Sequence, residues 1–326
     1  MTAPVATAIV PVYNGARFLE RCLASLRAQD TPGVEIIVVD DGSTDGSPDL
    51  VAPPVRLLRT GGRRGAGCAR NLGARAAAGA TLFFTDADVE VPPDWVRKGL
   101  AALAEHDAPF GGGGYAGPVV PSFIQRFAHE ELAWRRRRHH GFVRTLVSNN
   151  LYGRREAFLA AGGFPEHYQA ASSEDMEFSW KAARRHRLWW ARDNGVFHNY
   201  TPTLRAYLRQ QFRFARDAVP MLLGHPGLLR GRTHHGKQLY FEVAATGLLW
   251  AGLAVAPWFP AGPLPGAAAL FPLNLPFLVH LARRQGLRFA GRGFGAVFLR
   301  NSIILAGIAR GLAAALFRPG RTARGV

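Results

Sequence analysis

Carboxylate side chains follow two short apolar runs in the first part of the chain. Asp40 and Asp41 close the run EIIVV, and Asp86 and Asp88 come directly after TLFFT. Hard divalent cations such as Mg²⁺ or Mn²⁺ are typically held by one or two carboxylates, with phosphate oxygens and water completing the coordination. The first pair could instead receive a base or a ribose. Asp-Gly turns and Asp-x-Asp pairs are also common on surfaces, so this chemistry requires the two loops to meet in space.

The elements that position these carboxylates alternate between strand and helix. Apolar runs predict four strands, over 7–13, 35–40, 55–59 and 81–85. The spacing of apolar residues predicts a helix after Asn14, a suitable N-cap, and a second, Ala-rich helix over 66–79. Connections this short imply right-handed crossovers and a mostly parallel α/β sheet. Because such sheets bind ligands at the carboxyl ends of their strands, Tyr13, Asp40–Asp41 and Asp86–Asp88 should share one edge.

The middle of the chain is polar and less regular. We expect the glycines at 111–114 to form a loop, and a helix to begin after Ser172 and Ser173. The run RRRRHH at 135–140 fits either a solvated face or contact with anionic lipid or a phosphate-bearing acceptor.

Composition bears on the class of partner. The 326 residues include 40 Lys and Arg against 23 Asp and Glu, a formal net charge of +17. The basic residues gather at 135–140, between 205 and 237, and beside apolar runs beyond residue 240. Basic residues beside apolar segments are typical of a cytoplasmic membrane face, so we expect a membrane and no nucleic acid as partner. Two cysteines argue against a disulfide framework or a Cys-rich zinc site.

The last part of the chain is apolar enough for a bilayer. Two runs, 243–261 and 263–282, contain no Asp, Glu, Lys or Arg. Each is long enough to cross about 30 Å of hydrocarbon. The basic residues that follow predict a hairpin with both ends in the cytoplasm. A third run, 294–317, contains Arg300 and Arg310, which favours an interfacial helix over a third span. Core helices of a soluble domain are the remaining alternative.

Several motifs in a fixed order carry a family resemblance. PVYN, VVDDGSTD, GAGCARNLG and TDADV are followed by LYGRREAF, AGGFPE and SSEDMEFSWKA, over about residues 5–220. As a set they resemble the inverting glycosyltransferases of family 2. The resemblance implies the GT-A fold, a Rossmann-like, mostly parallel sheet, and a nucleotide-sugar donor. With the apolar runs it divides the chain into a catalytic domain, 1–235, and a C-terminal membrane region, 236–326.

The resemblance also implies a role for each matching residue. The base and ribose would be held by Pro11, Tyr13, Asp40 and Asp41, and Arg70 would approach the nucleotide or diphosphate. Asp86 would contact the donor, Asp88 would ligate Mg²⁺ or Mn²⁺, and Asp175 would be the general base for the acceptor hydroxyl. His198, after a late strand, would complete the metal site or be an ordinary structural histidine. Residues for the acceptor or the diphosphate would be Glu174, Arg213 and Arg216.

These features together predict a membrane-anchored, metal-dependent, inverting hexosyltransferase on the cytoplasmic side of the inner membrane. Its donor would be a nucleotide-diphosphate sugar, with a UDP-sugar favoured. Its acceptor would be a hydroxyl or a lipid phosphate, in polysaccharide, glycolipid or cell-envelope biosynthesis. A short processive polysaccharide synthase is the nearest alternative, but QQFRF has Phe214 where such synthases have Trp. A nucleotidyltransferase and a non-catalytic membrane scaffold are further alternatives.

Overall fold

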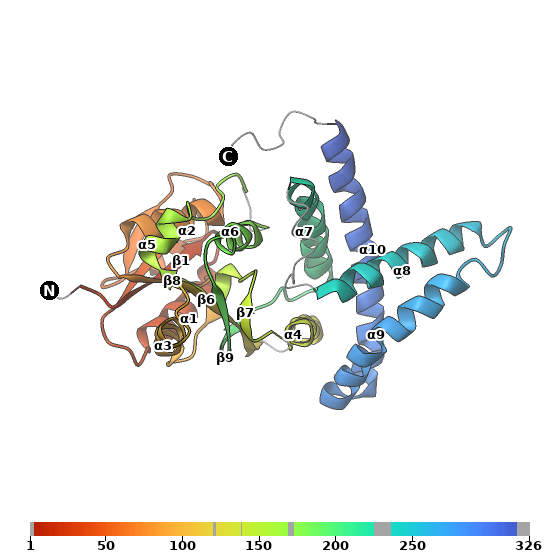
Figure 1. The fold of residues 1–326 in the computed structure, drawn as a ribbon, viewed down its shortest axis with the longest axis horizontal. Helices are drawn as coiled ribbons and strands as arrows, with labels where there is room; N and C mark the ends of the chain where they lie inside the picture. The colour runs from red at the N-terminus through yellow and green to blue at the C-terminus, as the bar shows by residue number, and fades with distance from the viewer. Residues whose placement is uncertain (1–2, 120–121, 138, 169–172, 225–235, 318–326) are drawn as a thin grey trace. The chain divides into compact units, whose positions relative to one another are not determined.

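The computed structural model describes residues 3–119, 122–137, 139–168, 173–224 and 236–317. Ser172, Arg138 in the RRRRHH run and residues 225–235 of the basic stretch lie outside the described residues. The chain forms two compact units (Figure 1). An α/β unit comprises residues 1–120 and 138–200, and a helical unit comprises 121–137 and 201–326. The functional division predicted at residue 235 stays a prediction.

One mixed sheet forms the centre of the α/β unit. Its strand order is β3-β2-β1-β4-β8-β6-β9-β5, with β7 pairing to β9. The first four strands in this order, β3, β2, β1 and β4, pair in parallel, as the sequence predicts. Strand β8 pairs antiparallel to both β4 and β6. The strands are β1 (Ala6–Val12), β2 (Val34–Asp40), β3 (Arg56–Arg59), β4 (Thr81–Phe84), β5 (Val89–Glu90), β6 (Phe110–Pro118), β7 (Gly141–Val143), β8 (Leu151–Arg154) and β9 (Leu188–His198).

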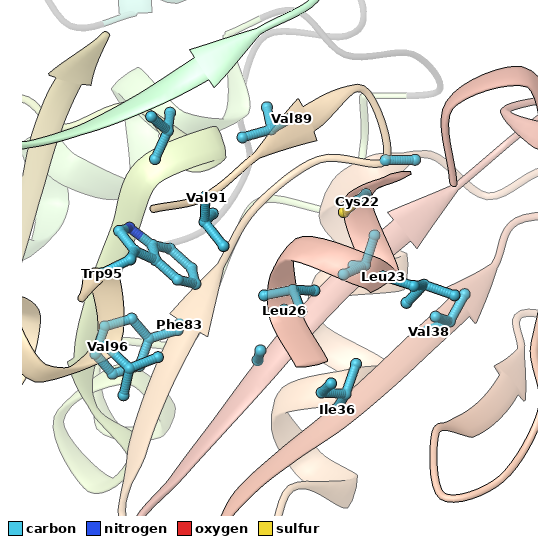
Figure 2. Packing of buried hydrophobic residues seen from close by; sticks show 14 of the residues in the cluster. Cys22, Leu23, Leu26, Ile36, Val38, Phe83, Val89, Val91, Trp95 and Val96 are labelled. Carbon is cyan, nitrogen blue, oxygen red and sulfur yellow. The ribbon is translucent and has the colours of Figure 1, made fainter. Parts of the chain in front are cut away.

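Helices cover both faces of this sheet because successive strand residues point to opposite faces. Ile36 and Val38 of β2 pack on one face with α1 and α3 (Figure 2), whereas Ile37 and Val39 pack on the other with α2, α5 and α6. A strand buried on both faces therefore reads as the continuous apolar run seen in the sequence. The helices are α1 (Ala16–Arg27), α2 (Ala66–Ala76), α3 (Trp95–Glu105), α5 (Arg155–Ala160) and α6 (Glu174–Ala182).

Two local predictions were wrong. The glycines at 111–114 form part of strand β6 and not a loop. Neighbours crowd the first three of them: a Cβ at Gly113 would lie 2.0 Å from the Asn194 carbonyl oxygen. Asn14 is not the N-cap of α1, since Gly15 occupies that position and the Asn14 side chain accepts the Thr44 N–H at 2.8 Å. The Asp45 carboxylate, from the loop after β2, accepts the Ala16 N–H instead.

Among the described residues of the helical unit, three helices are long and apolar enough to cross a membrane: α8 (Gly236–Val255, from residue 238), α9 (Leu264–Gln285) and α10 (Leu287–Phe317). It also contains α4 (Phe123–Arg136) and α7 (Leu204–Gly224). The apolar side of α4 packs through Phe127 on Phe277 of α9. Its Glu130 carboxylate accepts hydrogen bonds from Arg284 and Gln285 at 3.1 and 3.0 Å.

Buried charges change the interpretation of two arginine-containing segments. Arg300 is 1% exposed and donates to Glu242 at 2.6 Å, besides pairing with Glu131 of α4. Its charge is therefore neutralised inside the unit, and it does not by itself count against a third span.

In the RRRRHH run, Arg135 bonds Glu131 and Glu242, and Arg136 is 8% exposed. These two residues therefore do not form the solvated face or lipid contact considered from the sequence.

Candidate active site

Loops at the carboxyl ends of β1, β2 and β4 gather several of the predicted residues at one edge of the sheet. Asp41 organises the loop that precedes α2: its two carboxylate oxygens accept the N–H groups of Arg64 and Gly65, each at 2.8 Å, and the Thr60 hydroxyl at 2.9 Å. Gly42 has a φ of +82° and passes so close to Gly62 that a Cβ would lie 3.0 Å from its carbonyl carbon. The Asp41 side chain therefore shapes the site by holding the backbone of the loop that precedes α2.

The residues predicted to hold the base differ in exposure. Pro11 is buried within β1, whereas Tyr13, just beyond the strand, is 41% exposed and has the Arg63 guanidinium 4.3 Å from its ring centre. Asp40 is 4% exposed and accepts the Ser43 N–H at 3.0 Å, which tightens the turn after β2. An aromatic face and carboxylates are suited to stacking on a base and accepting its N–H groups.

Arg70 connects two loops of the site instead of pointing outward. It is 1% exposed and donates to Asp86 at 2.6 Å and to Glu174 at 3.1 Å. Burial disfavours its charge, but the two carboxylates outweigh that effect and the pKa of Arg70 is raised. The cation thus fixes the loop after β4 to the start of α6. The approach of Arg70 to the nucleotide or diphosphate that the family resemblance implies stays a prediction.

Helix α2, which carries Arg70, also fixes the turn that follows α5. The Asn71 side-chain amide pairs with the backbone of Phe164, accepting its N–H at 2.9 Å and donating to its carbonyl at 2.8 Å. Gly73 lets the helix approach the sheet, since a Cβ there would lie 2.6 Å from Ile9. The ARNLG motif is therefore a packing and positioning motif in this structure.

Asp175 lies in the first turn of α6, partly exposed but densely surrounded by protein. Its carboxylate accepts the Ser148 N–H at 3.3 Å and the Met176 N–H at 2.7 Å. Burial, followed by the negative charge of Glu174, raises the pKa of Asp175 to about 7. A carboxylate with a pKa near neutrality is matched to accepting a proton and releasing it again.

Asp88 and His198 come from different parts of the chain and meet where β5 pairs with β9. The Asp88 carboxylate lies 3.6 Å from His198 Nε2, and burial raises the pKa of Asp88 despite that neighbour. The buried Nδ1 of His198 has no hydrogen-bond partner among the described residues. No cluster of three or more His, Cys, Asp or Glu suited to a metal occurs in the described part of the chain. One carboxylate and one imidazole nevertheless suit Mg²⁺ or Mn²⁺, provided that phosphate oxygens and water supply the remaining ligands.

Two residues that the sequence analysis did not single out adjoin this pair. The Tyr115 ring packs 5.6 Å from the His198 ring, and the Asn149 side-chain amide donates to the Tyr115 hydroxyl at 3.0 Å. Asn149 follows Ser148, the residue that bonds Asp175. Tyr115 lies on β6, and Asn149 lies in the 3₁₀ turn Ser148–Asn150 that leads into β8. Only the pairing of β6 with β8 brings them together, so motif spacing gave no signal for them.

The remaining predicted residues belong to the helical unit. Arg213 and Arg216 lie on α7, where Arg216 is exposed and bonded to Asp217 at 2.6 Å. The helical unit also has a groove of about 510 Å³, lined mainly by apolar side chains of α4, α7 and α10 together with Arg292. None of the predicted site residues lines it.

Comparison with known proteins decides the family. The model of glycosyl transferase family 2 matches residues 7–213 of this chain. The chain belongs to that family. It is therefore a glycosyltransferase-family enzyme with a GT-A-like α/β domain, as its motifs predict.

Relatives and solved structures agree with this assignment. Glycosyltransferase AglE of Haloferax volcanii is 26% identical over 236 residues, which cover 67% of this chain and 74% of AglE. Succinoglycan biosynthesis protein ExoO of Rhizobium meliloti is 42% identical over 99 residues, which cover 29% of this chain and only 28% of ExoO. The fold is similar to mannosyltransferase PcManGT of Pyrobaculum calidifontis, solved with GDP-Man and Mn²⁺, at a TM-score of 0.59 and 21% identity over 96% of this chain and 88% of that one. TarS of S. aureus, solved with UDP-GlcNAc, has a TM-score of 0.52 and 19% identity over 89% of this chain and 90% of that one.

Proposed function

We propose that this enzyme transfers a sugar from a nucleotide-diphosphate sugar to a hydroxyl or lipid-phosphate acceptor at a membrane, with inversion at the anomeric carbon. One observation carries the proposal: Arg70 joins Asp86, in the loop after β4, to Glu174 at the start of α6, while His198 meets Asp88 in the same loop. GDP-Man and UDP-GlcNAc are bound by the two structural neighbours, and a UDP-sugar is the donor we favour.

Each group has a defined part in this proposal. Pro11, Tyr13, Asp40 and Asp41 bind the base and ribose, and the Asp41 carboxylate also holds the loop that precedes α2 in place. Asp88 and His198 would hold Mg²⁺ or Mn²⁺, which neutralises the charge that develops on the departing diphosphate. Asp175 accepts the proton of the acceptor hydroxyl while that oxygen bonds the anomeric carbon and the bond from carbon to diphosphate oxygen breaks. With an ionised lipid phosphate as acceptor, Asp175 positions it and takes no proton.

The membrane part of the proposal depends on α8, α9 and α10. All three are long and apolar enough to span, and basic residues at the end of α9 and the start of α10 favour a cytoplasmic location for that end. We propose an enzyme of the inner membrane whose catalytic unit faces the cytoplasm. Arg213 and Arg216 remain proposed contacts of the acceptor or diphosphate, and Glu174 a proposed contact that also anchors Arg70.

The deciding experiment uses the full chain in lipid nanodiscs with a panel of UDP-, GDP- and TDP-sugars and either Mg²⁺ or Mn²⁺. We expect metal-dependent turnover of one donor, abolished in Asp88→Ala, and at least 100-fold slower transfer to a hydroxyl acceptor in Asp175→Asn. Calorimetry with each nucleoside diphosphate and Mn²⁺ is run in parallel, because it needs no acceptor. Absence of binding by every nucleoside diphosphate would contradict the proposal.

A further inference from the structure

The contacts between the residues of the site form a closed ring. Asp88 meets His198, His198 packs against Tyr115, and Tyr115 bonds Asn149. The residue before Asn149 bonds Asp175, whose neighbour Glu174 bonds Arg70. Arg70 finally bonds Asp86, two residues before Asp88. Every side of this ring except the Tyr115–Asn149 side has a part in the proposed function.

The Tyr115–Asn149 side of the ring lies between the proposed metal ligands and the proposed base. In the transfer reaction the sugar ring must occupy that interval, because its anomeric carbon bonds the diphosphate oxygen on one side and the acceptor on the other. The Tyr115 side chain is half-buried and Asn149 is 7% exposed. Both are therefore held in place by the fold, and neither swings freely in solvent.

Their chemistry matches a sugar hydroxyl. A primary amide offers two donors and an acceptor oxygen with two lone pairs, and a phenol both donates and accepts. Among the described residues, the Tyr115 hydroxyl is the one side-chain group that bonds the Asn149 amide. The amide therefore has hydrogen-bonding capacity beyond that contact, in a ring where Arg70 is already bonded to Asp86 and Glu174.

We propose that Asn149 and Tyr115 are specificity-determining residues that bind a hydroxyl of the transferred sugar and so set which hexose is accepted. This inference rests on the proposed function. A site built to hydrogen-bond a substrate hydroxyl strongly rejects analogues that lack it or place it elsewhere. The pair should thus discriminate donors that differ in the orientation of one hydroxyl and share the same nucleotide.

The test compares Asn149→Ala and Tyr115→Phe with the full-length wild type in nanodiscs. The readout is the ratio of kcat/KM for the preferred donor to that for its epimers with the same nucleotide. We expect kcat/KM for the preferred donor to fall by about 10- to 100-fold, and the preference between epimers to shrink to within about threefold. The Kd of the nucleoside diphosphate with Mn²⁺ should stay within about twofold, because neither side chain contacts the nucleotide.

Tyr152→Phe is the matched control. It removes the same phenolic oxygen from a fully buried tyrosine of β8 that is not part of the ring, so donor preference should be unchanged. Equal losses for all epimers in Asn149→Ala and Tyr115→Phe would overturn the inference and leave the proposed function standing. If the wild type binds no nucleoside diphosphate, both fail together. A structural role alone would lower stability without altering the preference between epimers.

Discussion

The carboxylates of this site share one chemical type and differ in what surrounds them. Asp41 accepts three hydrogen bonds from the loop that precedes α2. Asp86 is paired with Arg70 and Asp88 with His198. Asp175 receives two backbone N–H groups and has another carboxylate beside it. Environment, more than residue type, separates the proposed structural, metal-binding and proton-accepting roles.

The pKa of Asp175, raised to about 7 by burial and by Glu174, predicts a specific pH profile. A base must be deprotonated to act, so kcat/KM with a hydroxyl acceptor should rise about tenfold per pH unit below 7 and level off above it. The measurement is initial rate against pH at saturating metal. Glu174→Gln removes the neighbouring negative charge and should move the rise to lower pH. A rate that falls as the pH increases from 6 to 8 would contradict Asp175 as the base.

At the scale of elements, strand β6 depends on the small size of its residues at some positions and not at others. Replacing Gly113 by alanine would place a Cβ 2.0 Å from the Asn194 carbonyl oxygen, whereas at Gly114 the nearest atom, in the Trp190 ring, is 3.5 Å away. We expect Gly113→Ala to destabilise the fold by about 1–3 kcal/mol or more, and Gly114→Ala by much less. Thermal unfolding of the two variants checks this, and equal melting temperatures would refute it.

Much of the α/β unit could be predicted from the sequence. Strands β1 and β4 and most of β2 are buried on both faces, and that burial demands the apolar runs from which they were predicted. The edge strand β3 is shorter and only half-buried at Leu57 and Leu58. The glycine run in β6 resembles a loop in the sequence because the need for glycine arises from tertiary contacts. Where side chains of Gly111, Gly112 and Gly113 would stand, the space is occupied by Tyr152, Asn150 and Asn194. The inward placement of Arg70 depends on Glu174, 104 residues away, and no local pattern encodes such a partner.

At the scale of the whole molecule, the helical unit depends on buried ion pairs. Arg300 of α10 bonds Glu242 of α8 and pairs with Glu131 of α4. Removing one partner from a buried pair leaves an uncompensated charge and costs about 3–5 kcal/mol. Arg300→Met should therefore lower the melting temperature in detergent, while Arg310→Met, at an exposed position of the same helix, should leave it nearly unchanged. Similar melting temperatures for both variants would show that the Arg300 network does not stabilise the unit.

Membrane topology gives a second prediction at this scale. In a chain carrying Cys22→Ala and Cys68→Ser, we expect Trp258→Cys, between α8 and α9, to react with an impermeant maleimide from outside the cell. Arg288→Cys, at the start of α10, should react only from the cytoplasmic side. Both positions are exposed within the helical unit, so accessibility to the reagent reports the side of the membrane. Labelling of both from one side would contradict the proposed hairpin.

Helix α4 belongs to the helical unit, although the chain enters it between two strands of the α/β unit. Its Phe127, Glu130 and Glu131 contact residues of α7, α9 and α10, all of them later in the sequence. During synthesis this helix therefore leaves the ribosome before any surface exists to receive it. A soluble fragment made by stopping the chain at residue 200 would retain the same unpartnered helix. Removing the apolar tail is thus not enough to obtain a well-behaved catalytic fragment: the apolar side of α4 must also be redesigned.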